Sequence, residues 1–148
     1  MSKGVYIFLL IVICSCRYSE SKIDKEESII ENEAYDKAWE FFELEENDSA
    51  YIYFNKSYSK FTKSKNNHQA AKCLLNMAFI GNKKGDWFSG QELTIEAIKL
   101  LNPQIKDEKE TLSSAYNILG QTQHDLGIYK EAINYYQKAI DFSTEKDV

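Results

Sequence analysis

Residues 113–146 read SSAYNILGQTQHDLGIYKEAINYYQKAIDFSTEK, and this stretch decides the fold. Small and apolar side chains recur along it at spacings of three and four, the period of an amphipathic α-helix. Gly127 interrupts the pattern, because glycine readily takes the left-handed backbone conformation that ends a helix. After it, Ala132, Tyr136 and Ala139 form a small, aromatic, small stripe. The stretch therefore predicts two antiparallel helices that cross closely at their small residues.

The pattern resembles the tetratricopeptide repeat, a helix-turn-helix unit of about 34 residues. Tyr116, Leu119 and Gly120 stand at the aromatic, leucine and glycine positions of its first helix. The resemblance implies an all-α fold in which helical hairpins stack into a right-handed α-α superhelix, the tetratricopeptide solenoid. It also implies a protein-binding module with no enzymatic activity.

Two weaker copies of the stripe lie upstream. Their members are Gly90, Thr94 and Ala97, which begin 42 residues before Ala132, and Ala50, Phe54 and Ser57, which begin 40 residues earlier still. Residues 104–110, QIKDEKE, absorb the extra length before the last copy or lengthen its first helix. Gly85 marks the second turn, no glycine marks the first, and Asp48 or Ser49 is expected to cap the helix that follows it. We predict three hairpins within residues 28–148, as repeats at about 31–64, 71–104 and 113–146.

The chain begins with a secretory pattern. Residues 5–14, VYIFLLIVIC, are an apolar run of ten that follows Lys3. Ten helical residues cover about 15 Å of a hydrocarbon core about 30 Å thick, so a permanent span is not expected. Residues 13–16, ICSC, resemble the bacterial lipobox, which implies lipidation of Cys16 and cleavage before it. We predict a lipoprotein signal peptide over residues 1–15 and a flexible tether over residues 16–27; the alternatives are an uncleaved short anchor and an ordinary signal peptide.

The composition excludes several classes of function. Acidic residues outnumber basic ones 23 to 18, so no basic field attracts nucleic acid. Three Cys and two His are too few for a closed zinc site, and only Cys73 remains outside the predicted lipobox region. The six Gly match no phosphate loop, dinucleotide fingerprint or hydrolase elbow. We therefore predict no metal, no cofactor and no enzymatic activity.

The resemblance also predicts a binding groove, because the first helices of successive tetratricopeptide hairpins line the concave surface. The family positions that face a ligand fall here on Tyr35, Trp39, Lys72, Asn76, Phe79, Asn117, Gln121 and His124. Such a groove combines aromatic anchors with amides that can bond an extended peptide. For Trp39 and Phe79, burial in the core is an equal alternative. For Asn117 and Gln121, plain solvent exposure is an equal alternative to ligand contact.

The C-terminal end offers a second surface. The last helix is expected to end near Phe142, and only STEKDV follows, so Tyr135, Ile133 and Ile140 are expected to be partly exposed. Either the chain is a fragment of a longer array, or this face meets a partner, self-association through the last helix included.

We therefore predict a scaffold, anchored by its N-terminal lipid to the bacterial cell envelope, that binds a peptide or protein. The alternative is the N-terminal sensory region of a longer membrane-anchored signalling protein or transcriptional regulator.

Overall fold

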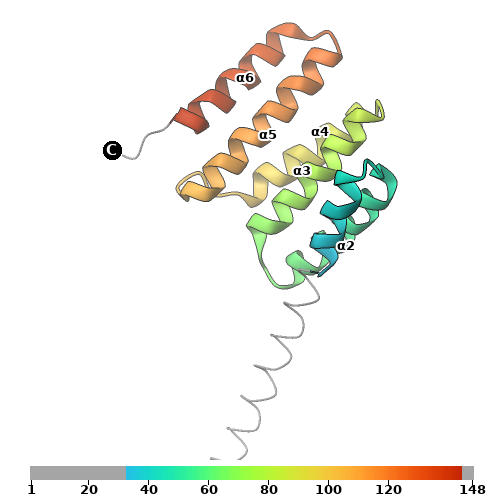
Figure 1. Cartoon of the computed structure of the whole chain (residues 1–148). Helices are drawn as coiled ribbons and strands as arrows, with labels where there is room; N and C mark the ends of the chain where they lie inside the picture. Colours follow the sequence, from blue (N-terminus) through green and yellow to red (C-terminus); the bar gives the residue numbers. More distant parts are fainter. Residues whose placement is uncertain (1–32, 145–148) are drawn as a thin grey trace, which may run out of the picture. The chain divides into compact units, whose positions relative to one another are not determined.

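The computed structural model describes residues 33–144 as six α-helices in three consecutive pairs (Figure 1). The first pair combines the described part of the first helix, residues 33–43, with α2 (Asn47–Lys63). The second pair is α3 (Asn67–Lys83) with α4 (Trp87–Leu100), and the third is α5 (Lys106–Asp125) with α6 (Tyr129–Thr144). No strand occurs within these residues. The predicted all-α fold built from helical hairpins is confirmed.

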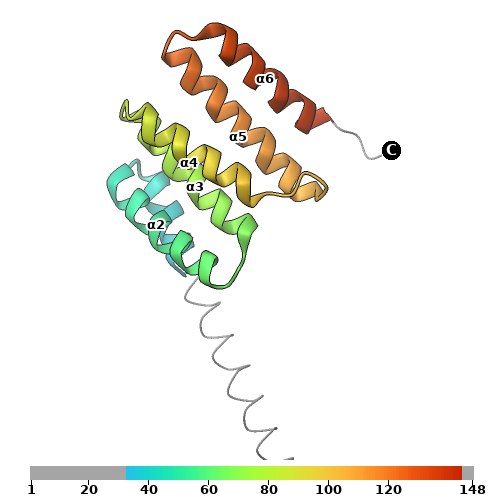
Figure 2. The ribbon, with the colours of Figure 1, turned by 180° about the vertical axis from the view of Figure 1, so that it is seen from behind.

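The helices belong to one compact unit of the chain, Ala34–Val148. In both views the α3–α4 pair lies between α2 and the α5–α6 pair (Figure 1, Figure 2). Contacts between α2 and α3, between α4 and α5 and between α3 and α5 join the neighbouring pairs. The predicted signal peptide over residues 1–15, Cys16 and the tether over residues 16–27 lie outside the described residues.

Four of the five connections between helices have the same backbone geometry. Each contains one residue with positive φ: Glu45 (59°), Lys65 (59°), Gly85 (80°) and Gly127 (76°). In each, an amide N–H bonds a carbonyl five residues earlier, as in Ile128 to Gln123 at 2.8 Å. This bond satisfies a carbonyl that the end of a helix leaves free. The two glycines confirm their predicted turns, whereas Glu45 takes the left-handed conformation in the first pair, where the sequence has no glycine.

The fifth connection, between α4 and α5, is extended. Leu101 leaves the helix with φ −99° and ψ 143°, and Pro103 follows. Beyond it α5 begins at Lys106, seven residues before the predicted start of the third repeat at 113. The polar residues upstream of the repeat thus lengthen its first helix.

The expected cap of α2 is wrong. The residue before the helix is Glu46, and no side chain caps it. Asp48 instead forms an ion pair with Lys84, and Ser49 donates to Glu46 Oε2. Side-chain caps do occur at the next two helices. Asn66 caps α3 by accepting a hydrogen bond from Gln69 N, and Asp86 caps α4 by accepting one from Ser89 N, each at 3.3 Å.

The core repeats more regularly than the sequence does. Residues 41–60 and residues 81–100 have the same order of buried, half-buried and exposed positions. Phe54 and Thr94 are equivalent, and both are 0% exposed. Thr94 suits this apolar position because its hydroxyl donates to the Gly90 carbonyl at 2.7 Å. The predicted stripe is therefore the contact between the helices of each pair.

The candidate binding groove

A groove of about 640 Å³ runs along the first helices of the three pairs. Every residue that lines it comes from residues 33–43, from α3 or from α5. The first helix provides Tyr35, Trp39 and Phe42; α3 provides His68, Lys72, Leu75, Asn76 and Phe79; α5 provides Asp107, Glu110, Thr111, Ser114 and Ile118. The groove thus lies between neighbouring pairs.

One part of the groove is aromatic. Trp39 makes edge-to-face contacts with Tyr35, Phe42 and the fully buried Phe54, at centroid distances of 6.2, 5.4 and 5.6 Å. Phe42 continues this cluster to Phe79, 5.9 Å away on α3. Trp39 and Phe79 are half-buried, so each ring packs on the core with one side and borders the groove with the other. Trp39 and Phe79 are therefore partly in the core and partly in the groove, which combines the two alternatives.

Charged and polar groups line the groove between α3 and α5. His68 Nε2 lies 2.8 Å from Thr111 Oγ1 and joins the two helices. Partial burial, and then the positive charge of Lys72, lower the pKa of His68, against the opposing effect of nearby carboxylates. The pKa of His68 therefore lies below the ordinary value, and the ring is mostly neutral at pH 7. Asp107 and Glu110 are exposed on the α5 side, and Lys72 lies half-buried on α3.

Five of the eight predicted groove residues line this groove: Tyr35, Trp39, Lys72, Asn76 and Phe79. Asn117, Gln121 and His124 do not line it, and their part in binding stays a prediction. The reason they do not line it follows from equivalent positions, which lie 40 and then 42 residues apart. Asn117 corresponds to Tyr35 and Leu75, and Gln121 to Trp39 and Phe79. The groove is lined by the first helices of successive pairs, and among the described residues no further pair follows α5–α6.

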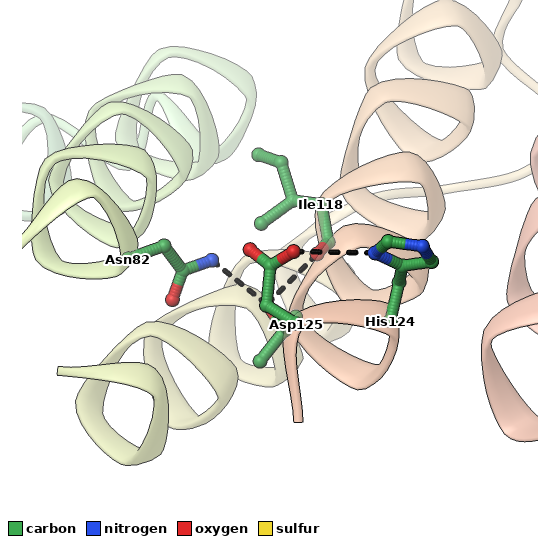
Figure 3. A network of polar contacts seen from close by, with 5 residues as sticks. Asn82, Ile118, His124 and Asp125 are labelled. Carbon is green, nitrogen blue, oxygen red and sulfur yellow. Dashed lines mark hydrogen bonds and ion pairs between the residues drawn. The ribbon is translucent and has the colours of Figure 1, made fainter. Parts of the chain in front are cut away.

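The three residues lie elsewhere on the third pair. Asn117 borders a smaller hollow of about 400 Å³ with Tyr136 and Ile140, and Gln121 is exposed. His124 lies near the end of α5, where Nδ1 is 3.3 Å from Asp125 Oδ1 (Figure 3). Its ring also meets Tyr129 edge to face.

The sequence reasoning missed the α5 side of the groove. Asp107, Glu110, Thr111, Ser114 and Ile118 recur at spacings of three and four, which places them on one side of a helix. That spacing can be seen in the sequence, but Asp107, Glu110 and Thr111 precede residue 113, where the predicted repeat begins, and therefore fall outside its groove positions. His68, equally unpredicted, lies one turn before Lys72 on α3.

A polar contact next to the groove fixes α3 against α5. The Asn82 amide donates to Thr122 Oγ1 at 2.7 Å, and that hydroxyl donates to the Ile118 carbonyl at 2.8 Å (Figure 3). Asn82 Oδ1 is buried, and no group within residues 33–144 donates a hydrogen bond to it. The same amide lies against Gly90 at the crossing of α3 and α4.

Cys73 is buried in the core beside the groove. Burial raises the pKa of its thiol to about 12, so almost no thiolate exists at neutral pH. This agrees with its interpretation as a small core residue rather than a nucleophile. Within residues 33–144, no helix combines the length and the apolar character needed to cross a membrane.

Residues 113–145 match the family model described as Tetratricopeptide repeat. No curated protein matches the chain. The match covers the third pair, and the first two pairs repeat its helix-turn-helix form. Residues 113–145 are therefore a tetratricopeptide repeat, a helical unit that generally acts in protein-protein interaction.

Proposed function

We propose that this protein is a non-enzymatic scaffold of the bacterial cell envelope that binds a peptide segment of a partner protein in the groove. The observation that carries the proposal is the composition of the groove. Half-buried aromatic rings lie beside polar groups of α3 and α5 in one hollow. Binding sites of this kind hold an apolar side chain and fix its orientation with a few polar contacts.

The charges favour a basic segment next to the apolar anchor. Asp107 and Glu110 are exposed carboxylates, Lys72 is the one lysine or arginine of the lining, and His68 is mostly neutral at pH 7 because its pKa is lowered. The lining is thus acidic by one charge. An aromatic or aliphatic anchor fits against Tyr35, Trp39 and Phe79, and a lysine or arginine a few residues away can reach the carboxylates.

Fluorescence of Trp39 tests this proposal directly. The chain has two tryptophans, so Trp87→Phe leaves Trp39 as the only indole. Synthetic peptides with a Phe or Leu anchor followed by two lysines serve as the probe, and the same peptides with glutamate in place of lysine are the comparison. We expect the basic peptides to change Trp39 emission at lower concentrations than the acidic ones.

Charge reversal separates groove binding from general attraction to an acidic protein. Asp107→Lys with Glu110→Lys should reverse the preference between the two peptide sets. The matched control is Glu92→Lys with Glu131→Lys, which changes the net charge equally on exposed positions of α4 and α6. Equal effects of the two double variants, or no response of Trp39 to any peptide, would rule the proposed site out.

The envelope location rests on the sequence alone. The lipobox-like residues 13–16 support an anchor on Cys16, and a lipidated tether would hold the repeats near the membrane surface. In a bacterial expression host, metabolic labelling with a palmitate analogue should label the wild type and Cys14→Ser but not Cys16→Ser. Labelling that survives Cys16→Ser would contradict the anchor and leave the groove proposal untouched.

A further inference from the structure

An apolar stripe runs along the outer side of α6. Ile133 is 67% exposed, Ile140 is 51% exposed and Tyr135, which stacks on Tyr116, is half-buried, so all three are partly exposed as predicted. Ile133 and Ile140 are seven residues apart, so they lie on the same side of the helix two turns from one another. Tyr129, 61% exposed, begins the same side.

Equivalent positions in the inner pairs carry contacts to the next pair. Ile133 corresponds to Tyr51 and Gln91, and Ile140 to Tyr58 and Ile98, all of them half-buried. Gln91 Oε1 accepts from Gln123 Nε2 on α5 at 3.2 Å. Tyr58 donates its hydroxyl to Glu96 on α4. Ile98 packs against the core cluster that α4 shares with α5. This side of the second helix is therefore a surface at which helices of this chain meet other helices.

The charges of α6 are arranged symmetrically about the middle of the stripe. Lys130 and Asp141 are both exposed, and by helical period they flank the isoleucines on one edge. The midpoint between Lys130 and Asp141, like that between Ile133 and Ile140, lies within one residue of Tyr136. In an antiparallel pair of α6 helices, Ile133 of each copy would thus lie against Ile140 of the other copy, and Lys130 of each copy would lie near Asp141 of the other.

Other charges of α6 do not disturb this arrangement. Lys138 Nζ lies over the rings of Tyr116 and Tyr135, at 5.4 and 5.6 Å, and so points toward α5. Glu131 falls on the far side of the helix by its period. A surface that is complementary to itself in this way is what a two-fold symmetric interface requires.

We propose that two copies of this chain associate through an antiparallel, two-fold symmetric contact between their α6 helices. The proposal is independent of the groove, which is lined by the first helices of the pairs. The small apolar area of one helix face predicts a weak dimer, whose formation depends on concentration.

Disulfide trapping of the full chain in mild detergent tests the contact. All variants carry Cys14→Ser and Cys16→Ser, which leaves the buried Cys73 as the only native thiol. Gln137→Cys places a thiol next to the proposed axis, and Lys99→Cys, on an exposed position of α4, is the matched control. With a mild oxidant, we expect Gln137→Cys to form a covalent dimer several times faster than Lys99→Cys.

Two further changes test the packing and the charges. Ile133→Glu, on an exposed position that should not affect helicity, should reduce trapping at residue 137 to the level of the control. Asp141→Lys should also reduce it, and the additional change Lys130→Asp should restore it. Equal trapping at residues 137 and 99, trapping that survives Ile133→Glu, or products larger than dimers would overturn the proposal.

Discussion

Replacing Gly90 with alanine tests how closely α3 and α4 approach each other. A Cβ added at Gly90 would lie 2.0 Å from Asn82 Oδ1, 2.8 Å from Asn82 Cγ and 3.2 Å from the Ala78 carbonyl oxygen. The first two distances are far below van der Waals contact, so the Asn82 amide must turn away. Turning breaks its 2.7 Å hydrogen bond to Thr122 on α5. The substitution therefore disturbs a contact between pairs as well as one within a pair.

The magnitude follows from three effects. Alanine is more favourable than glycine inside a helix by about 1 kcal/mol. Against this gain, overpacking costs about 1 to 3 kcal/mol, and the lost hydrogen bond costs about 1 kcal/mol. Gly90→Ala should therefore lower the free energy of unfolding by about 1 to 3 kcal/mol in urea denaturation followed by circular dichroism.

Gly81 provides the matched control within the same pair. A Cβ there would lie 3.6 Å from the Asp86 carbonyl oxygen and 4.0 Å from Gly90 N, which is ordinary contact. Gly81→Ala should therefore raise stability by up to about 1 kcal/mol. The decisive comparison is Gly90→Ala in an Asn82→Ala background, where room for the new methyl group exists. If Gly90→Ala destabilises that background as much as it destabilises the wild type, the contact with Asn82 is not the cause and the reasoning fails.

Three other predictions concern the groove and the core. Trp39→Ala should weaken peptide binding and also cost about 2 kcal/mol of stability, since the ring is half-buried against Phe54; urea denaturation that shows no loss would place the ring outside the core. The pKa of His68 is lowered from 6.5 in the folded chain, so the unfolded chain binds a proton at a higher pH than the folded chain does. The contribution of neutral His68 to the free energy of unfolding is therefore fully present above about pH 6.5, and it should be lost as the pH falls toward the folded pKa. NMR titration, with His124→Gln to assign the signals, should give a His68 midpoint below 6.5, and His68→Gln should show a shallower loss of stability over this range. Cys73 in a chain that begins at residue 17 should react with a disulfide reagent only slowly until urea is added, because burial raises its pKa to about 12; rapid reaction of the folded chain would show that the core opens easily.

The parts of the fold that are written locally could be predicted from the sequence. Gly85 and Gly127 mark turns because glycine takes positive φ at little cost, and the stripe through Ala132, Tyr136 and Ala139 reads directly as one helix face. The turn at Glu45 could not be predicted in this way. A glutamate at such a turn gives no sequence signal of this kind, and neither does Lys65, which has the same positive φ at the next turn.

Close contacts between helices depend on side chains that the pattern leaves undefined. The stripe predicted a small residue at position 90, but not that the amide of Asn82 occupies the space beside it. The equivalent position in the first pair holds Phe42, whose ring packs on Phe54 instead. The same burial pattern is thus reached with an amide in one pair and an aromatic ring in another, and only the packed structure distinguishes them.

The groove was half predictable because its two sides have different origins. The aromatic side comes from family positions of the first helix and α3, and Tyr35, Trp39 and Phe79 were found there. The α5 side exists because that helix begins at Lys106, so that Asp107 and Glu110 reach the groove beside α3. The extended connection after Leu101 permits this early start, and nothing in a 34-residue pattern specifies it.

A residue's position in the repeat therefore decides which neighbour it faces, and the presence of that neighbour decides what it does. Trp39 and Phe79 border a groove because a further helix pair follows each of them. Gln121 occupies the equivalent position on α5 and is exposed, and it is an amide rather than an aromatic ring. On α6 the equivalent surface is apolar instead. Ile133 is exposed there, at a position where the inner pairs contact the next pair. The two helices of the last pair thus present different surfaces: polar positions on α5 that suit solvent, and an apolar stripe on α6 that suits another helix.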